Sequence, residues 1–473
     1  MGFKKGVSRE QIILFPESID EYITANNRVR FIDAFVEQLD LEELGFERVR
    51  PEIEGRPAFD PKDLLRLYIY GYLNDIESSR KLERESGRNV ELMWLMGKLK
   101  PGFRTISDFR KGNVVALTGV FRQFTMLCRG LGLFGGELIA IDGSKFKAVN
   151  SREKNYNKKK LKKLIELTDA RIEEYLRRMK EADEAEAEAE VKEPTADELK
   201  EMIKELKKRK QHLEETKKKL VDSGQTQISL TDPDGRLMKT RQGTRVCYNV
   251  QIAVDSKHKL IAAIDVSNDR TDQRQLFNIA AAAKQMLGVE VLEVVTDRGY
   301  YNSEEVKKCE DAGITAYMDK PHAPSRNGKF TRDEFIYNAN RDLYKCPAGQ
   351  ELVYITTEKG RRLRYYATTA CNSCSVRKQC TDATHHRTIK RLANEASLER
   401  AVRRARDNPE KMKRRKELAE HPFGTIKAAM NQGSFLTKGL SKVKGEISLT
   451  ALAYNIKRVM NILGVEKMME ALA

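Results

Sequence analysis

Short apolar runs alternate with helical segments between residues 137 and 318, and this alternation constrains the fold more than any other feature. Runs of β-branched residues predict strands, whereas apolar residues at helical spacing predict helices. The expected strands are 138–142, 246–255, 258–266, 289–296 and 314–318, and the expected helices between them are 272–287 and 303–312. The order strand, hairpin, helix, strand, helix, strand predicts an α/β fold whose mixed sheet has a parallel part.

Helical patterns dominate the regions around this sheet. Asp60 and Pro61 provide an N-cap and a first helical position near the N-terminus, a longer helix is expected at 105–131, and another at 448–463. We divide the chain into a helical N-terminal domain at 1–131, a first part of the sheet core at 132–156, a helical hairpin at 157–221, the continued core at 222–320, a cysteine-rich insertion at 321–396 and a C-terminal helical part at 397–473.

The charge balance bears on the partner. Lys and Arg number 87 against 70 Asp and Glu, and the net charge of +17 favours polyanionic partners, nucleic acid first. The short N-terminal helices resemble a helix-turn-helix DNA-binding unit, a pattern that other small helical bundles share. No stretch approaches the roughly 18 uncharged residues of a membrane span, and the first residues lack the apolar core of a signal peptide. We therefore expect a cytoplasmic protein without a membrane partner.

Four of the apolar runs end in an aspartate. These residues are Asp142, Asp255, Asp265 and Asp297. The carboxyl ends of parallel strands meet at one edge of a sheet, so Asp142 and Asp297 are expected to lie together there. Asp255 and Asp265 fall at opposite ends of the predicted hairpin, and aspartate is a common turn former. We therefore expect these two to serve turns.

Three sequence strings suggest a family. They are Ile141-Asp142-Gly143-Ser144-Lys145-Phe146, Thr296-Asp297-Arg298-Gly299-Tyr300-Tyr301 and Glu420-His421-Pro422-Phe423-Gly424-Thr425-Ile426-Lys427. In this order they resemble the DDE transposases of bacterial insertion sequences. The resemblance implies a ribonuclease H-like core with Asp142 on its first strand, Asp297 after its fourth and Glu420 on a late helix. It also implies that the N-terminal domain binds DNA.

A large group of these transposases carries the pattern Tyr-x2-Arg-x3-Glu-x6-Lys. Glu420 and Lys427 match its last two positions, and the tyrosine is absent. The arginine position falls on Lys416, with Arg415 one residue earlier as the alternative counterpart. The resemblance therefore implies catalytic roles for Asp142, Asp297, Glu420 and Lys427.

Clustered carboxylates suit metal-dependent phosphodiester chemistry. Hard divalent cations prefer carboxylate oxygens, and two such ions activate the attacking oxygen and stabilise the leaving one. The resemblance implies two Mg²⁺ or Mn²⁺ ions on the three acids, double-stranded DNA of element ends and target as the partner, a homodimer in the synaptic complex and association with the nucleoid. The expected DNA contacts are Lys145, Arg298, Arg415 and Lys427.

Four of the seven cysteines lie close together in the sequence. Cys346, Cys371, Cys374 and Cys380 form the pattern C-x24-C-x2-C-x5-C, and a pair spaced by two residues is typical of zinc knuckles. A structural Zn²⁺ and a cluster of buried reduced thiols are the two alternatives. The other cysteines, Cys128, Cys247 and Cys309, lie in apolar stretches and are expected in the core.

Two other functions share these features. A ribonuclease H-like nuclease or resolvase would use the same acids for hydrolysis without strand transfer. A transposase-derived protein that binds DNA without catalysis would share the basic charge. The presence of Asp142, Asp297 and Glu420 together argues against the second alternative.

Overall fold

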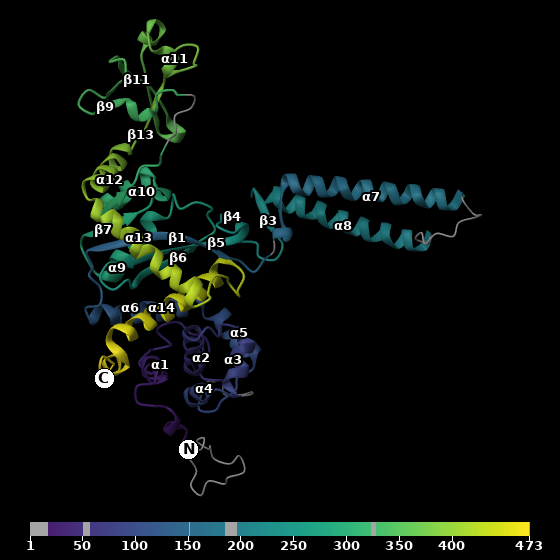
Figure 1. The fold of residues 1–473 in the computed structure, drawn as a ribbon. Helices are drawn as coiled ribbons and strands as arrows, with labels where there is room; N and C mark the ends of the chain where they lie inside the picture. The colour runs from purple at the N-terminus through teal and green to yellow at the C-terminus, as the bar shows by residue number, and fades with distance from the viewer. Residues whose placement is uncertain (1–17, 51–56, 151, 185–195, 323–327, 473) are drawn as a thin grey trace, which may run out of the picture.

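The structure is a computed structural model, and it describes residues 18–50, 57–150, 152–184, 196–322 and 328–472. A six-stranded mixed sheet lies near the middle of the molecule, with a helical region on one side and two projections (Figure 1). One projection is a long helical hairpin, and the other ends in a small second sheet. The mixed α/β architecture agrees with the expected fold class.

Strand β1 (Leu138–Lys147) is the centre of the large sheet. It pairs in parallel with β7 (Leu292–Thr296), which pairs in parallel with β8 (Ile314–Met318). On its other side β1 is antiparallel to β5 (Gly243–Asp255). The far edge of β5 carries β4 (Arg236–Thr240) and β6 (Ile261–Ser267), both antiparallel to it. β1 extends beyond the expected 138–142 because it stays paired with β5 as far as Lys147.

Helices cover both faces of this sheet. On one face, α9 (Leu276–Leu287) and α10 (Ser303–Asp311) pack on the odd-numbered β1 residues Ile139 and Ile141. On the other, Leu418 and Ala419 of α13 (Pro409–Gly424) pack against Ala140. The helix α12 (Glu395–Asp407) lies beside β8 and ends before Asn408-Pro409, where a break was predicted. Asp142 is even-numbered, so it belongs to the α13 face.

Six short helices form the N-terminal region. They are α1 (Arg28–Glu37), α2 (Pro61–Leu73), α3 (Ser79–Ser86), α4 (Val90–Leu95), α5 (Phe103–Gly112) and α6 (Val114–Gly130). The side chain of Asp60 caps α2 by accepting a hydrogen bond from the Lys62 N–H (2.8 Å). The prediction of one helix at 105–131 was wrong. The chain breaks at Asn113, whose side chain accepts a hydrogen bond from the Glu47 N–H (2.7 Å) and so ties the α5–α6 junction to another segment.

The C-terminal helix α14 (Leu440–Glu470) joins this helical region to the sheet. It begins before the expected 448–463, and its backbone leaves helical geometry at Gly464, directly after the expected end. Its buried residues share one core with α1, α2, α6 and strand β5. Among the described residues, none of the helices combines the length and apolar character that a membrane span needs.

The hairpin consists of α7 (Lys158–Glu184) and α8 (Ala196–Asp222). It starts from the short antiparallel pair β2 (Asn155–Asn157) and β3 (Gln227–Ser229), and Leu161, Leu213 and Leu220 form its buried seam near that root. Residues 185–195, between the two helices, lie outside the described residues.

The small sheet is entirely antiparallel. Its strands are β9 (Ile336–Asn338), β10 (Leu343–Lys345), β11 (Glu351–Glu358), β12 (Leu363–Ala367) and β13 (Ile389–Leu392), and a short helix α11 (Arg377–Cys380) lies beside it. Its core contains Phe335, Tyr344, Leu352, Tyr366 and Ile389. The insertion predicted at 321–396 therefore contains a sheet with a core of its own.

Candidate functional site

The parallel pairing of β1 and β7 brings Asp142 and Asp297 to one edge of the sheet. Leu138 pairs with Glu293 and Ala140 with Val295, and continuing this register places Asp142 level with Asp297. Both side chains are half-buried. The prediction that the two strands are parallel neighbours is confirmed, and Asp297 directly follows β7; Asp142, by contrast, lies within β1, which continues to Lys147.

The surroundings of Asp142 disfavour its charge. Burial, together with the nearby Asp297 carboxylate, raises the pKa of its carboxyl to about 6. The Gly143 N–H, which donates to Asp142 Oδ1 (2.9 Å), and the Arg415 guanidinium act in the opposite direction. The Asp142 and Asp297 carboxylates therefore repel each other, and a bound cation would reduce this repulsion.

Asp297 starts the turn that follows β7. Its Oδ1 accepts a hydrogen bond from the Gly299 N–H (2.7 Å) and caps the 3₁₀ turn Arg298–Tyr300. Tyr300 is buried and its hydroxyl donates to Gln251 Oε1 on β5, whereas the neighbouring Arg298 is exposed. Tyr300 thus holds the turn against β5, and Arg298 remains exposed to solvent.

Glu420 lies on α13 directly after Leu418 and Ala419, which pack on the sheet. Its side chain is exposed, and no hydrogen bond or ion pair holds it within the described residues. As placed in the described ranges, no three His, Cys, Asp or Glu side chains form a group that could hold a metal ion. The structure thus brings Asp142 and Asp297 together without completing a set of three with Glu420.

Lys427 lies against β1, two residues beyond the level of Asp142. Its ammonium donates to Ser144 Oγ (2.5 Å) and to the Lys145 carbonyl (2.9 Å), and it lies 4.5 Å from the centre of the Phe146 ring. Burial lowers the pKa of this amine to about 8. The helix continues through Pro422 to Gly424 and changes to a π-helical turn at Thr425–Ala429, which carries Lys427.

A further acid, Asp272, lies at this edge of the sheet and was not predicted from the sequence. It follows β6, and its Oδ1 accepts hydrogen bonds from Lys145 Nζ (3.1 Å), Asn249 Nδ2 (2.6 Å) and Gln251 Nε2 (2.8 Å). A helix was predicted from Asp272, but α9 begins at Leu276 because this side chain binds across the sheet instead of capping the helix. The direction of β6 was the signal that could have found it. β6 is antiparallel to β5, which is antiparallel to β1, so β6 also ends at the Asp142 edge.

The hairpin aspartates have separate roles. The carboxylate of Asp255 accepts hydrogen bonds from the N–H groups of Gly135, Gly136 and Lys257, so its predicted turn role is confirmed. Asp265 instead lies within β6 and forms an ion pair with Lys444 of α14 (2.7 Å), so its predicted turn role was wrong.

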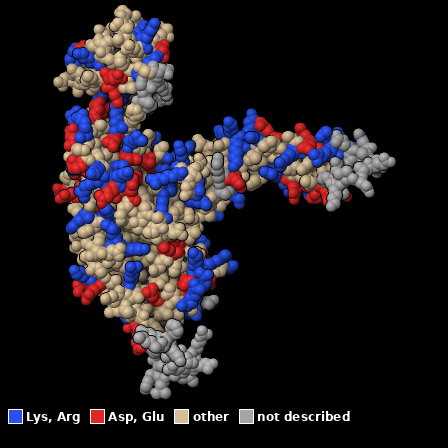
Figure 2. Space-filling model, viewed as in Figure 1, with Lys and Arg blue, Asp and Glu red and all other residues tan. Residues whose placement is uncertain are grey.

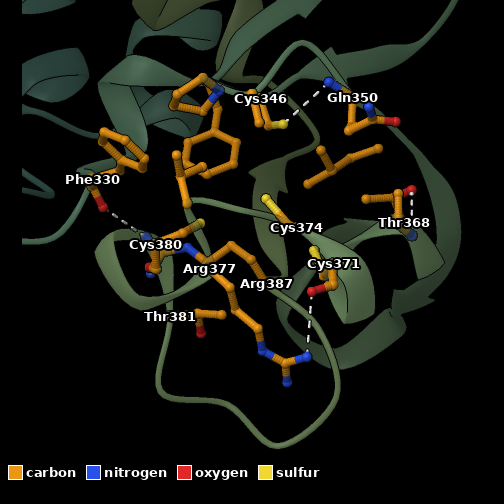
Figure 3. A pocket seen from close by; sticks show the side chains of 16 residues that line it. Phe330, Cys346, Gln350, Thr368, Cys371, Cys374, Arg377, Cys380, Thr381 and Arg387 are labelled. Carbon is orange, nitrogen blue, oxygen red and sulfur yellow. Dashed lines mark hydrogen bonds between the residues drawn. The ribbon is translucent and has the colours of Figure 1, made fainter.

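A second candidate site lies beside the small sheet. Cys346, Cys371, Cys374 and Cys380 line one cavity (Figure 3). Burial raises the pKa of the Cys380 thiol, and the other three cysteines raise it further. The Gln350 N–H donates to Cys346 Sγ (3.3 Å), an interaction that suits a thiolate. The fold therefore gathers four residues whose sequence spacing suggested a common site.

The remaining cysteines behave as predicted. Cys128, Cys247 and Cys309 are free and buried, and burial raises the pKa of each thiol. They are core residues rather than members of either site.

Comparison with known families covers both ends of the chain. A transposase domain model (DUF772) matches residues 17–112, which contain helices α1 to α5. A transposase DDE domain model matches residues 345–460, which include the four clustered cysteines, Glu420 and Lys427. No curated protein and no solved structure matches the chain.

Proposed function

Since the chain belongs to the DDE transposases of insertion sequences, we propose that it binds the terminal inverted repeats of its own element and, as a dimer holding two ends, cuts and joins DNA strands. DNA as the partner and transposition as the activity follow from the family. The terminal repeats, the dimer and the catalytic residues are the proposal.

The sheet supports a ribonuclease H-like core. Its strands in chain order are β1, β5, β6, β7 and β8, with β4 as an addition on the outer edge of β5. Asp142 therefore lies on the first core strand, and Asp297 directly follows the fourth. This is the placement of acids that the resemblance requires.

The aligned acid pair is the observation that carries the catalytic proposal. Asp142 and Asp297 end up level on parallel strands, and their mutual repulsion raises the pKa of Asp142. Such a pair suits Mg²⁺ or Mn²⁺, which when bound activates an attacking oxygen and stabilises a leaving one. Asp142 and Asp297 would hold the ions, and the unattached Glu420 would complete the set from α13.

Basic side chains near these acids would hold the DNA strand. The charge of Arg415 acts on Asp142, and Lys427 lies against strand β1, which carries Asp142. Arg298 is exposed beside Asp297. Lys and Arg are spread over the visible face of the sheet region and the root of the hairpin (Figure 2). Lys145 differs from these because its ammonium pairs with Asp272.

We also infer that the four clustered cysteines bind a structural Zn²⁺. They line a single cavity. As placed in the described residues they do not form a group that could hold a metal ion, so zinc would have to draw the four thiols together. A set of four thiolates is a usual structural zinc site. Zinc there would stiffen the small sheet that lies between Asp297 and Glu420 in the chain.

A strand-transfer assay tests the main proposal. The full chain is incubated with DNA carrying its element ends, a target plasmid and Mg²⁺ or Mn²⁺. Joined products support the transposase, whereas nicks alone favour the hydrolytic nuclease. If Asp142→Asn joined DNA strands as fast as the wild type, Asp142 would not be a catalytic residue, and the catalytic part of the proposal would be wrong.

A further inference from the structure

One carboxylate outside the predicted triad, that of Asp272, lies at the edge of the sheet that carries Asp142 and Asp297. Asp272 comes after β6, which runs in the same direction as β1 and β7, so all three strands end at the same edge. Its side chain retains 23% of its exposure and that of Lys145, its ion-pair partner, 17%. The pair is therefore largely withdrawn from water.

Three side-chain donors hold this carboxylate in place. Lys145, Asn249 and Gln251 all bind the same oxygen, Asp272 Oδ1, at 2.6–3.1 Å. Hydrogen bonds to an ionised acceptor are stronger than neutral ones, and three of them leave the group little freedom. The donors come from β1 and β5, so they fix Asp272 to the sheet itself.

Gly143, the residue after Asp142, makes room for the same carboxylate. A Cβ at this position would lie 2.6 Å from Asp272 Oδ1 and would also collide with Gln251 Nε2. At Gly299, two residues after Asp297, a Cβ would lie 3.7 Å from Asp272 Oδ2, which is an ordinary contact distance. Asp272 therefore packs tightly against β1 at Gly143 and lies near the turn that follows Asp297.

A buried hydrogen-bond chain links Asp272 to the Asp297 turn. The Tyr300 hydroxyl donates to Gln251 Oε1, and the amide group of the same Gln251 donates to Asp272. Tyr300 is 1% exposed, so breaking this chain would leave polar groups unpaired in the core. A shift of Asp272 would therefore disturb Gln251, and through Gln251 the Tyr300 side chain in the turn that follows Asp297.

We propose that Asp272 is a positioning residue for the reaction: it holds the β1 segment around Asp142 in register with the turn that follows Asp297, and it holds Lys145 beside them. This inference rests on the proposed function. The conservative change Asp272→Asn keeps the shape of the side chain but loses the charge that binds three donors. Loss of comparable supporting groups around metal ligands costs about 10- to 100-fold in activity or metal affinity.

The test compares Asp272→Asn with Asp265→Asn in the full chain. Asp265 is the control because it lies opposite Gln251 in the same sheet, but its carboxylate pairs with a different lysine, Lys444 of α14. We expect Asp272→Asn to lower kcat for strand cleavage about 10- to 100-fold and to weaken Mn²⁺ binding, followed by electron paramagnetic resonance without DNA, by a similar factor. KM for DNA should stay within about twofold, and Asp265→Asn should match the wild type.

Further variants separate positioning from simple stabilisation. Gly143→Ala should displace the carboxylate without removing it and reproduce the kcat loss, which keeps the proposal testable if Asp272→Asn does not fold. Lys145→Met combined with Asp272→Asn should be no worse than Asp272→Asn alone if the two act as a unit. Unchanged kcat and Mn²⁺ affinity in Asp272→Asn, or a loss that only follows a lower Tm, would overturn the proposal. Activity retained by Asp142→Asn would overturn the proposed function instead.

Discussion

The acidic edge of the large sheet and the cysteine cavity of the small sheet both gather side chains of the kinds that bind metals, but their supports differ. Asp142 and Asp297 extend from strands whose neighbours belong to three buried clusters of the main body. The cysteines border a core of five buried residues. Small units with little apolar core depend on metals or cross-links for stability. The acids are thus held in place by the fold, whereas the thiols are expected to hold their part of the fold together.

Loss of a zinc ligand should have the largest effect. Zinc contributes about 10–16 kcal/mol of apparent binding energy in small zinc domains, so Cys374→Ser should release the metal and unfold β9–β13. Metal analysis of the purified chain should give about one zinc per wild-type chain and a fraction of that in the variant. Limited proteolysis should cleave the variant within the small sheet while leaving the main body intact. Cys128→Ser, outside the cavity, is the control, and a zinc-free wild type would contradict the inference.

The acidic edge should respond in the opposite way. Asp142→Asn should reduce strand cleavage about a thousandfold or more because one metal-binding carboxylate is lost. The same change should raise the stability of the metal-free chain by about 1–2 kcal/mol near neutral pH, because burial and Asp297 penalise the Asp142 charge. Thermal unfolding without divalent ions measures the second effect. A lower Tm would show that the pair stabilises the fold and would remove the contrast with the cysteines.

A half-buried acid outside both sites, Glu77, provides a reference for the effect of Asp142 on stability. Burial, aided by the Glu446 carboxylate, raises the pKa of Glu77 to about 7 from its usual 4.5. The folded chain therefore binds more protons than the unfolded chain between these values, and stability falls as pH rises from about 4.5 to 7. For this partly exposed group we expect a loss of about 1–2 kcal/mol.

Glu77→Gln should remove that pH dependence, as measured by urea unfolding at several pH values. Added Mg²⁺ should leave the Glu77 effect unchanged, whereas it should stabilise the chain through Asp142 and Asp297. Equal slopes in wild type and variant would contradict the role of Glu77.

The smallest effect is expected at Lys427. If its ammonium contacts a DNA phosphate, Lys427→Met should weaken DNA binding several-fold and lower the slope of log K against log salt by about 0.9. Lys442, an exposed lysine of α14, serves as the control. Fluorescence anisotropy at several salt concentrations gives both slopes. An unchanged slope would mean that Lys427 acts on the protein through Ser144 and Lys145 alone.

Much of the architecture follows from local sequence patterns. The alternation of apolar runs predicted β5, β6, β7 and β8 to within a few residues, and β8 at its observed ends. Apolar periodicity and turn residues act over a few neighbours, so they can be read without knowing the fold. The same reasoning placed Asp142 and Asp297 at one edge and the four cysteines in one group. It failed at Asn113, where a distant backbone group ended the helix early.

The sequence by itself therefore determined that Asp142 and Asp297 belong to neighbouring strands and that four cysteines share a spacing. Only the tertiary structure decided which partners those groups meet. Asp272 joins the acidic edge because two antiparallel pairings bring β6 back into the direction of β1, a relation between segments more than a hundred residues apart. The same strand pairings place Lys145 beside the Asp272 carboxylate. Glu420 remains exposed on α13, and the packing of this helix on the sheet decides where Glu420 lies.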